Sequence, residues 1–139
     1  MTAGSKLKDG IRAAETAGSV DFDALMQANL VRVFGERDAD RRRAALHELY
    51  AEDAVLYEPQ AVASGWEAIS SAVDSLLAGM PPGFAFSPAG RAVGHNGVGR
   101  LFWRAGPPAG PVAATGTDVA HIEGGRIKLL HVFLDPAPR

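Results

Sequence analysis

Residues 111–135 read PVAATGTDVAHIEGGRIKLLHVFLD and predict two long β-strands joined by a tight turn at Glu123-Gly124-Gly125. Glycine takes up positive φ without steric cost, so it suits such a turn. Alternate residues of the first strand share one face of the sheet: Val112, Ala114, Gly116, Asp118, Ala120 and Ile122. All except Asp118 are apolar or small. A carboxylate on a burying face is unfavourable unless it is paired, hydrogen-bonded or protonated, so Asp118 is the first candidate for a functional residue.

Length and composition indicate one ordinary globular domain. The chain has 139 residues, of which 47% are hydrophobic and 22% charged. A formal net charge of −2 gives no electrostatic reason to expect nucleic acid or an anionic membrane as a partner. The absence of cysteine excludes disulfides, thiol chemistry and thiolate metal sites.

The N-terminal residues 1–20 are rich in Ala, Gly, Ser, Thr and Lys and predict a mobile tail, followed by one domain over residues 21–139. Met1 to Gly10 contain no apolar segment of the kind that a signal peptide needs. No apolar run approaches the length that crosses a bilayer. These observations predict a soluble cytoplasmic protein.

Apolar residues at helical spacing predict three helices, over residues 21–35, about 40–50 and 64–79. Asp21 is expected to cap the first helix, and Ser64 with Glu67 to form a capping box on the third. In the second helix Arg41-Arg42-Arg43 follow acidic residues. We expect these arginines to form a solvated surface, with a phosphate site as the alternative.

Strands are predicted at residues 55–58, 84–86, 91–95 and 98–105, with a loop between Pro59 and Ser64. The strand at 55–58 ends at Pro59, and Asn96-Gly97 is a hairpin turn signal. In the strand at 98–105 alternation places four small or apolar residues on one face: Gly99, Leu101, Trp103 and Ala105. Three helices interrupted by one short strand, then a curved antiparallel sheet, make an α+β fold.

Several short motifs in the sequence resemble those of a known family. They are Leu49-Tyr50-Ala51-Glu52-Asp53-Ala54 before Tyr57-Glu58-Pro59, then Gly65-Trp66-Glu67-Ala68-Ile69, and finally Gly116-Thr117-Asp118, Gly125-Arg126-Ile127 and Phe133-Leu134-Asp135. In this order the chain resembles the nuclear transport factor 2-like superfamily, most closely its SnoaL-like branch, which is similar to polyketide cyclases and ketosteroid isomerases. The resemblance implies a cone-shaped sheet wrapped by three helices around an apolar pocket, no cofactor, and a homodimer formed through the outer sheet face.

The resemblance also implies roles for two acids. In ketosteroid isomerases a carboxylate before the proline that follows the first strand acts as the base, and Glu58 matches it. A protonated acid on the penultimate strand donates a hydrogen bond to the oxyanion, and Asp118 matches it. A third member, a tyrosine, falls near Leu30, which cannot donate. The aspartate of SnoaL-like cyclases falls at Val132, so that group is absent too.

The other candidate binding residues are aromatic or shape the pocket. Trp66 and Trp103 could stack on a flat ligand, although core packing is the alternative, especially for Trp66. Tyr50 could donate a hydrogen bond in place of the missing tyrosine, or pack in the core. Leu30, Leu101, Gly116 and Val132 complete the predicted lining. For the acids, the alternatives are that Asp118 bonds a nearby Thr or Trp N–H and that Glu58 is a surface residue.

The four histidines, His47, His95, His121 and His131, lack the spacing of a metal site, so no metal is expected. His121 and His131 are expected to lie off the pocket face and close together across the hairpin.

The two acids and the apolar pocket predict a cofactor-independent isomerase, cyclase or dehydratase that moves a proton on a small apolar carbonyl compound. The alternative is a ligand-binding or structural dimer with the same cavity. Neither nucleic acid nor a membrane is expected as a partner.

Overall fold

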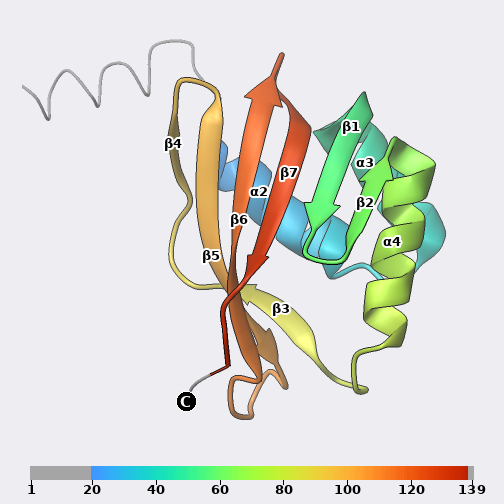
Figure 1. The fold of residues 1–139 in the computed structure, drawn as a ribbon, viewed down its shortest axis with the longest axis vertical. Helices are drawn as coiled ribbons and strands as arrows, with labels where there is room; N and C mark the ends of the chain where they lie inside the picture. Colours follow the sequence, from blue (N-terminus) through green and yellow to red (C-terminus); the bar gives the residue numbers. More distant parts are fainter. Residues whose placement is uncertain (1–19, 138–139) are drawn as a thin grey trace, which may run out of the picture.

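A computed structural model describes residues 20–137, which form an α+β fold, as predicted (Figure 1). The predicted mobile tail lies, except for Val20, outside the described residues. The elements in chain order are α2 (Phe22–Asn29), the π-helix η1 (Leu30–Phe34), α3 (Ala39–Leu49), β1 (Tyr50–Glu58), β2 (Ala61–Ser64), α4 (Trp66–Ala78), β3 (Ala85–Pro88), β4 (Val93–His95), β5 (Val98–Gly106), β6 (Ala114–Glu123) and β7 (Arg126–Leu134).

The strands form one curved, unclosed sheet in the order β2-β1-β7-β6-β5-β3, with β4 also paired to β5. The predicted hairpin of residues 111–135 is confirmed as β6 and β7, and both turn glycines have positive φ: 60° at Gly124 and 78° at Gly125. One pairing differs from the predicted antiparallel sheet, because β1 runs parallel to β7. The tip of β1 is thereby held beside the last strand, far away in sequence.

The predicted inner face of β5 and β6 is confirmed by burial except at its start, because Val112 is exposed in the loop before β6 and Ala114 is only partly buried. Gly116, Asp118, Ala120 and Ile122 are buried on β6, and Gly99, Leu101, Trp103 and Ala105 on β5. This face packs with apolar residues of the helices to form the core. Within residues 20–137, no helix has the length and apolar character needed to cross a membrane.

The first helical segment begins as predicted, because the side chain of Asp21 accepts a hydrogen bond from the Ala24 N–H at 2.9 Å. It ends at Gly35, also as predicted, but its second half differs. Leu30–Phe34 is a π-helix, in which N–H groups bond five residues back instead of four. Leu30 and Phe34 are both buried, and Val33 between them is buried too.

The start of α4 corrects the capping-box prediction. Ser64 is the last residue of β2, a strand where a loop was expected, and it does not cap the helix. The cap position is Gly65, which has a φ of 87° and makes no side-chain hydrogen bond. The chain passes here from a strand into a helix within one residue, and glycine adopts that backbone conformation readily.

Arg42 corrects the expectation that all three arginines face solvent. It is 0% exposed, whereas the side chains of Arg41 and Arg43 are 72% and 44% exposed. Arg42 lies on the same helix face as the buried Ala45, Leu46 and Leu49, three, four and seven residues ahead. Adjacency in sequence suggested one basic surface, but helical phase separates the middle arginine from its neighbours.

The guanidinium of Arg42 ties three segments together. It donates to Ser70 Oγ at 3.0 Å, to the carbonyl oxygen of Glu36 at 2.6 Å and to the carboxylate of Asp74. The turn before α3, helix α3 itself and helix α4 are joined through one buried side chain.

Strand β1 starts earlier than the predicted strand at 55–58, because residues 50–54 also belong to it.

Candidate functional site

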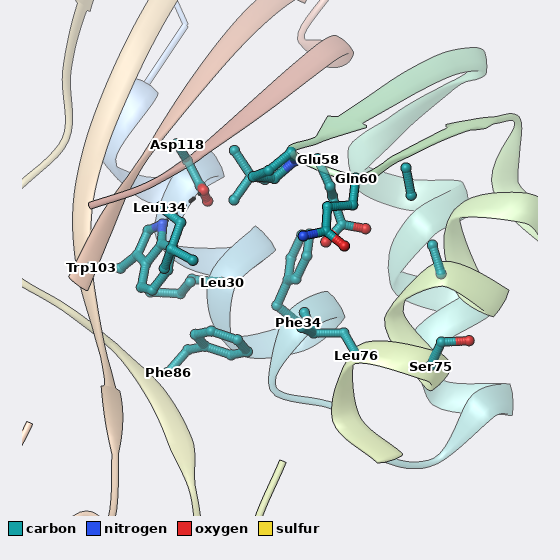
Figure 2. A pocket seen from close by; sticks show the side chains of 14 residues that line it. Leu30, Phe34, Glu58, Gln60, Ser75, Leu76, Phe86, Trp103, Asp118 and Leu134 are labelled. Carbon is teal, nitrogen blue, oxygen red and sulfur yellow. Dashed lines mark hydrogen bonds between the residues drawn. The ribbon is translucent and has the colours of Figure 1, made fainter. Parts of the chain in front are cut away.

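A cavity of about 550 Å³ lies between the inner face of the sheet, η1 and α4. Its apolar wall consists mainly of Leu30, Phe34, Leu76, Phe86, Val132 and Leu134. Polar groups are few: Glu58 and Gln60 at the β1–β2 turn, Ser75 on α4, and Trp103 with Asp118 on the sheet (Figure 2). No Lys, Arg or His belongs to the lining that residues 20–137 provide. The cavity is thus suited to an apolar ligand without negative charge.

Asp118 contributes a deeply buried carboxyl group to this cavity. Its side chain is 3% exposed, and Oδ1 accepts a hydrogen bond from Trp103 Nε1 at 2.9 Å (Figure 2). Burial raises the pKa of Asp118 to about 7, against the opposing effect of the Trp103 hydrogen bond, and the negative charge of Glu58 raises it further. Asp118 therefore bonds a tryptophan N–H, one of the alternatives that its sequence left open, and it also lines the cavity.

Glu58 reaches the cavity from the other side. It is the last residue of β1, and the two-residue turn Pro59-Gln60 follows it before Ala61 begins β2. Its side chain is half-buried, and burial raises the pKa of its carboxyl group. Glu58 and Asp118 therefore open onto one cavity but differ in exposure. As pH rises, the less buried Glu58 is expected to ionise first, and its charge then opposes ionisation of Asp118.

Gly116 supports the site from behind and does not line it. A Cβ atom at this position would lie 2.2 Å from Cζ2 of Trp103 and 2.4 Å from the carbonyl oxygen of Phe133. The indole therefore lies directly against the backbone of β6. The rings of Phe86 and Trp103 pack edge-to-face, with ring centroids 5.4 Å apart.

Tyr50, Trp66 and Leu101, predicted to bind substrate, lie outside the cavity lining, as does Gly116. Tyr50 is fully buried and donates its hydroxyl proton to Asn29 Oδ1 at 2.5 Å. Burial raises the pKa of Tyr50 well above its usual range, and the charge of Asp118 adds to this effect. Leu101 is fully buried in the core beside Asp118 in the β5–β6 register.

Trp66 contacts Tyr50 and His47 and does not line the cavity. Its Nε1 donates to the carbonyl oxygen of Tyr50 at 3.1 Å, and its ring stacks on His47 with centroids 3.8 Å apart. The indole thus has its hydrogen-bond partner within the protein. Core packing, the alternative considered for Trp66, accounts for these contacts.

His121 and His131 are near each other on the outer face of the hairpin, as predicted, with ring centroids 6.4 Å apart. His131 stacks on Tyr57 at 4.6 Å. Across residues 20–137, no group of three or more His, Asp or Glu side chains is arranged to hold a metal ion.

Sequence reasoning missed several lining residues. Phe34 could have been found, because it lies four residues after Leu30 on the same apolar stripe. Phe86 belongs to a strand too short for its facing side to be read from alternation. Gln60 and Leu134 were missed because the loop after Pro59 and the end of the last strand give no periodic signal.

Comparison with known proteins agrees with this geometry. The family model of the SnoaL-like domain matches residues 28–130. A solved structure from Agrobacterium tumefaciens strain C58, described as a proposed isomerase of the SnoaL-like family, is 31% identical with a TM-score of 0.75. The match covers 81% of this chain and 96% of that one. A search of curated proteins found no match.

More distant structures share the fold. A proposed polyketide cyclase from Sinorhizobium meliloti is 18% identical with a TM-score of 0.62, over 81% of this chain and 95% of that chain. A proposed ketosteroid isomerase from Kribbella flavida is 15% identical with a TM-score of 0.63, over 85% of this chain and 80% of that chain. From the family match and the Agrobacterium structure together, the chain belongs to the SnoaL-like domain family, as the sequence resemblance predicts.

Proposed function

We propose that this protein transfers a proton on an uncharged, apolar carbonyl compound without a cofactor, with Glu58 as the base and Asp118 as a hydrogen-bond donor. The observation that carries the proposal is that two carboxyl groups of unequal burial open onto one apolar cavity. Acids whose pKa values are pushed apart by their surroundings can divide the acid and base roles. The description of the Agrobacterium relative as a proposed isomerase is consistent with such chemistry.

The reaction needs only groups that the chain supplies. Ionised Glu58 removes a proton from the carbon next to the carbonyl, and the electron pair of that C–H bond moves toward the carbonyl oxygen. The protonated carboxyl group of Asp118 donates a hydrogen bond to this developing oxyanion. Return of the proton from Glu58 to a different carbon completes an isomerisation. The apolar wall excludes water, which strengthens both interactions.

Glu58→Gln tests the proposal directly. The amide cannot accept the proton, so exchange of the α-protons of 2-tetralone in D₂O, followed by proton NMR, should slow at least about 100-fold relative to the wild-type enzyme. The double variant Glu58→Gln/Gln60→Glu is a useful contrast, because it places a carboxylate two residues away while position 58 still lacks one. Equal exchange rates for wild type and Glu58→Gln would remove Glu58 from the role of base.

Two observations favour a non-catalytic binding protein as the second candidate. Leu30 and Val132 line the cavity as apolar residues, where related mechanisms use a tyrosine and an aspartate. This candidate predicts that 2-tetralone quenches tryptophan fluorescence on binding while its α-protons exchange no faster than in buffer. The first candidate predicts binding together with accelerated exchange.

We also propose that the protein forms a homodimer through the outer face of the sheet. Phe102, Thr117 and Phe133 are neighbours across β5, β6 and β7, and the two phenylalanines are exposed. His131 and Tyr57 extend this row of rings toward β1. Exposed aromatic rings on a sheet face, here with the Arg100 guanidinium over the Phe102 ring, suit a second copy of the same face related by twofold symmetry.

Phe133→Glu should convert such a dimer into a monomer, because it replaces an exposed aromatic ring of the proposed interface by a charge. Molar mass is measured by light scattering coupled to size-exclusion chromatography. Val112→Glu is the matched control, since Val112 and Phe133 are both 54% exposed but Val112 lies in the loop before β6. A monomeric wild type, or a dimeric Phe133→Glu variant, would contradict the proposed interface.

A further inference from the structure

The two oxygen atoms of Asp118 have different surroundings. Oδ1 accepts the Trp103 indole N–H, whereas Oδ2 has no hydrogen-bond partner among residues 20–137. Every fully buried side-chain oxygen or nitrogen in that part of the chain has a hydrogen-bond partner. Because Oδ2 has none, it is not fully buried. Because Asp118 lines the cavity, Oδ2 is the oxygen that a ligand would meet.

Two contacts restrict the position of the Trp103 indole. The backbone of β6 at Gly116 leaves no room for a Cβ atom beneath the ring, and Phe86 meets the ring edge-on from β3. The indole Nε1 is therefore held at one place relative to Asp118, two residues further along β6. A ring with so little freedom sets the orientation of the carboxyl group that it bonds.

We propose that Trp103, seated on Gly116, is a positioning residue that directs the proton of Asp118 to Oδ2 and so toward the cavity. A carboxylic acid carries its proton on one oxygen, and the other oxygen is the better acceptor of a hydrogen bond. With the indole N–H bound to Oδ1, the proton belongs on Oδ2. The catalytic meaning of this arrangement rests on the proposed function, but the arrangement itself does not.

The same hydrogen bond acts on the acidity of Asp118. An N–H donor stabilises the ionised carboxylate more than the neutral acid, so the Trp103 bond lowers the pKa that burial raises. Trp103 thus limits how far the acid is weakened while holding it in place. A tryptophan that merely filled space would not orient the carboxyl group of Asp118, and its burial of Asp118 would raise the pKa where the N–H bond lowers it.

Trp103→Phe is the discriminating variant, because it keeps an aromatic ring but removes the N–H. The readout is the ¹³C NMR titration of the Asp118 side-chain carboxyl group in aspartate-labelled protein, assigned by its loss in Asp118→Asn. We expect the titration midpoint of Asp118 to rise by about one pH unit. Trp66→Phe is the matched control: it also removes an indole N–H, from a tryptophan outside the cavity lining, and should leave the midpoint unchanged.

Gly116→Ala tests the close contact between the backbone at Gly116 and the Trp103 ring. The added methyl group would displace the indole, so the Asp118 midpoint should rise as in Trp103→Phe. Gly99→Ala controls for strain, since a Cβ there would lie 2.5 Å from the ring of Phe22 and far from the Trp103 contact. If Gly116→Ala does not fold, Trp103→Phe still decides the proposal.

Two outcomes would overturn the proposal: an Asp118 midpoint in Trp103→Phe equal to that of the wild type, or an equal rise in Trp66→Phe. These results are independent of any reaction. If the midpoint rises only in Trp103→Phe and no α-proton exchange is found, Trp103 keeps its positioning role and the proposed reaction fails. If α-proton exchange is found and the Asp118 midpoint does not move in Trp103→Phe, the proposed reaction stands and the positioning role of Trp103 is overturned.

Discussion

Asp118→Asn is expected to stabilise the folded protein above about pH 7 by up to about 4 kcal/mol, and to have little effect near pH 4. The pKa of Asp118 is about 7 in the folded protein, against 3.8 for an unperturbed aspartate. Burial is the main cause. Asparagine is uncharged at every pH, and its side-chain oxygen can still accept the Trp103 N–H.

The sign follows from proton binding. Below about pH 4, Asp118 is protonated in both folded and unfolded chains and contributes no pH dependence. Between about pH 4 and pH 7 the folded protein retains a proton that the unfolded chain has lost, so wild-type stability falls by about 1.4 kcal/mol for each pH unit. Above about pH 7 the difference is constant. The variant lacks this loss, and its advantage therefore grows through the same range.

Urea unfolding of both proteins at several pH values between 4 and 8 measures the difference. The difference in the free energy of unfolding between the two proteins reports Asp118 together with its coupling to Glu58. Glu52→Gln, which changes an exposed carboxyl group on β1, is the control for replacing an acid by its amide. A difference between Asp118→Asn and wild type that stays constant from pH 4 to pH 8 would show that Asp118 is not buried as described.

Arg42→Ala should lower the free energy of unfolding by about 3–5 kcal/mol, the loss expected when one partner of a buried charged network is removed. The substitution leaves a cavity and removes the donor for Ser70 Oγ and for the carbonyl oxygen of Glu36. Arg42→Lys should recover only part of the loss, because an ammonium group cannot reproduce the planar fork of a guanidinium.

The chain offers its own controls in the same run of arginines. Arg41→Ala and Arg43→Ala remove only exposed ion pairs and should cost much less than Arg42→Ala. Urea unfolding under identical conditions compares the three. Similar losses for all three arginines would mean that the run behaves as one surface, as the sequence alone suggested.

The fold was largely predictable because its strongest signals are local. Alternation on β6 identified a buried face, and the Gly124-Gly125 pair located the turn of the hairpin. β2 was not predictable, since its four residues give no clear alternation and it depends on pairing with β1. The burial of Arg42 depends on helix phase and on partners in other segments, which adjacency in the sequence does not reveal.

Part of the candidate site was predictable for the same reason. Asp118 stood out as the one charged residue on an apolar face, and Trp103 shared a face with small and apolar residues. The structure brings Glu58, Leu30 and Val132 to the same cavity. The bond between Trp103 and Asp118 joins two strands in a particular register, and the seat at Gly116 depends on the orientation of one ring. Neither follows from residue spacing within a strand.

The division of the cavity between sheet and helices has a consequence for how such a protein can diverge. Both carboxyl groups belong to strands of one hydrogen-bonded sheet, whereas Phe34 and Leu76 come from helical segments packed over it. Substitutions on the helical side can alter the size and shape of the ligand that fits while the acids keep their spacing. Evolution or laboratory selection could therefore change substrate range through η1 and α4 and leave the chemistry of the sheet intact.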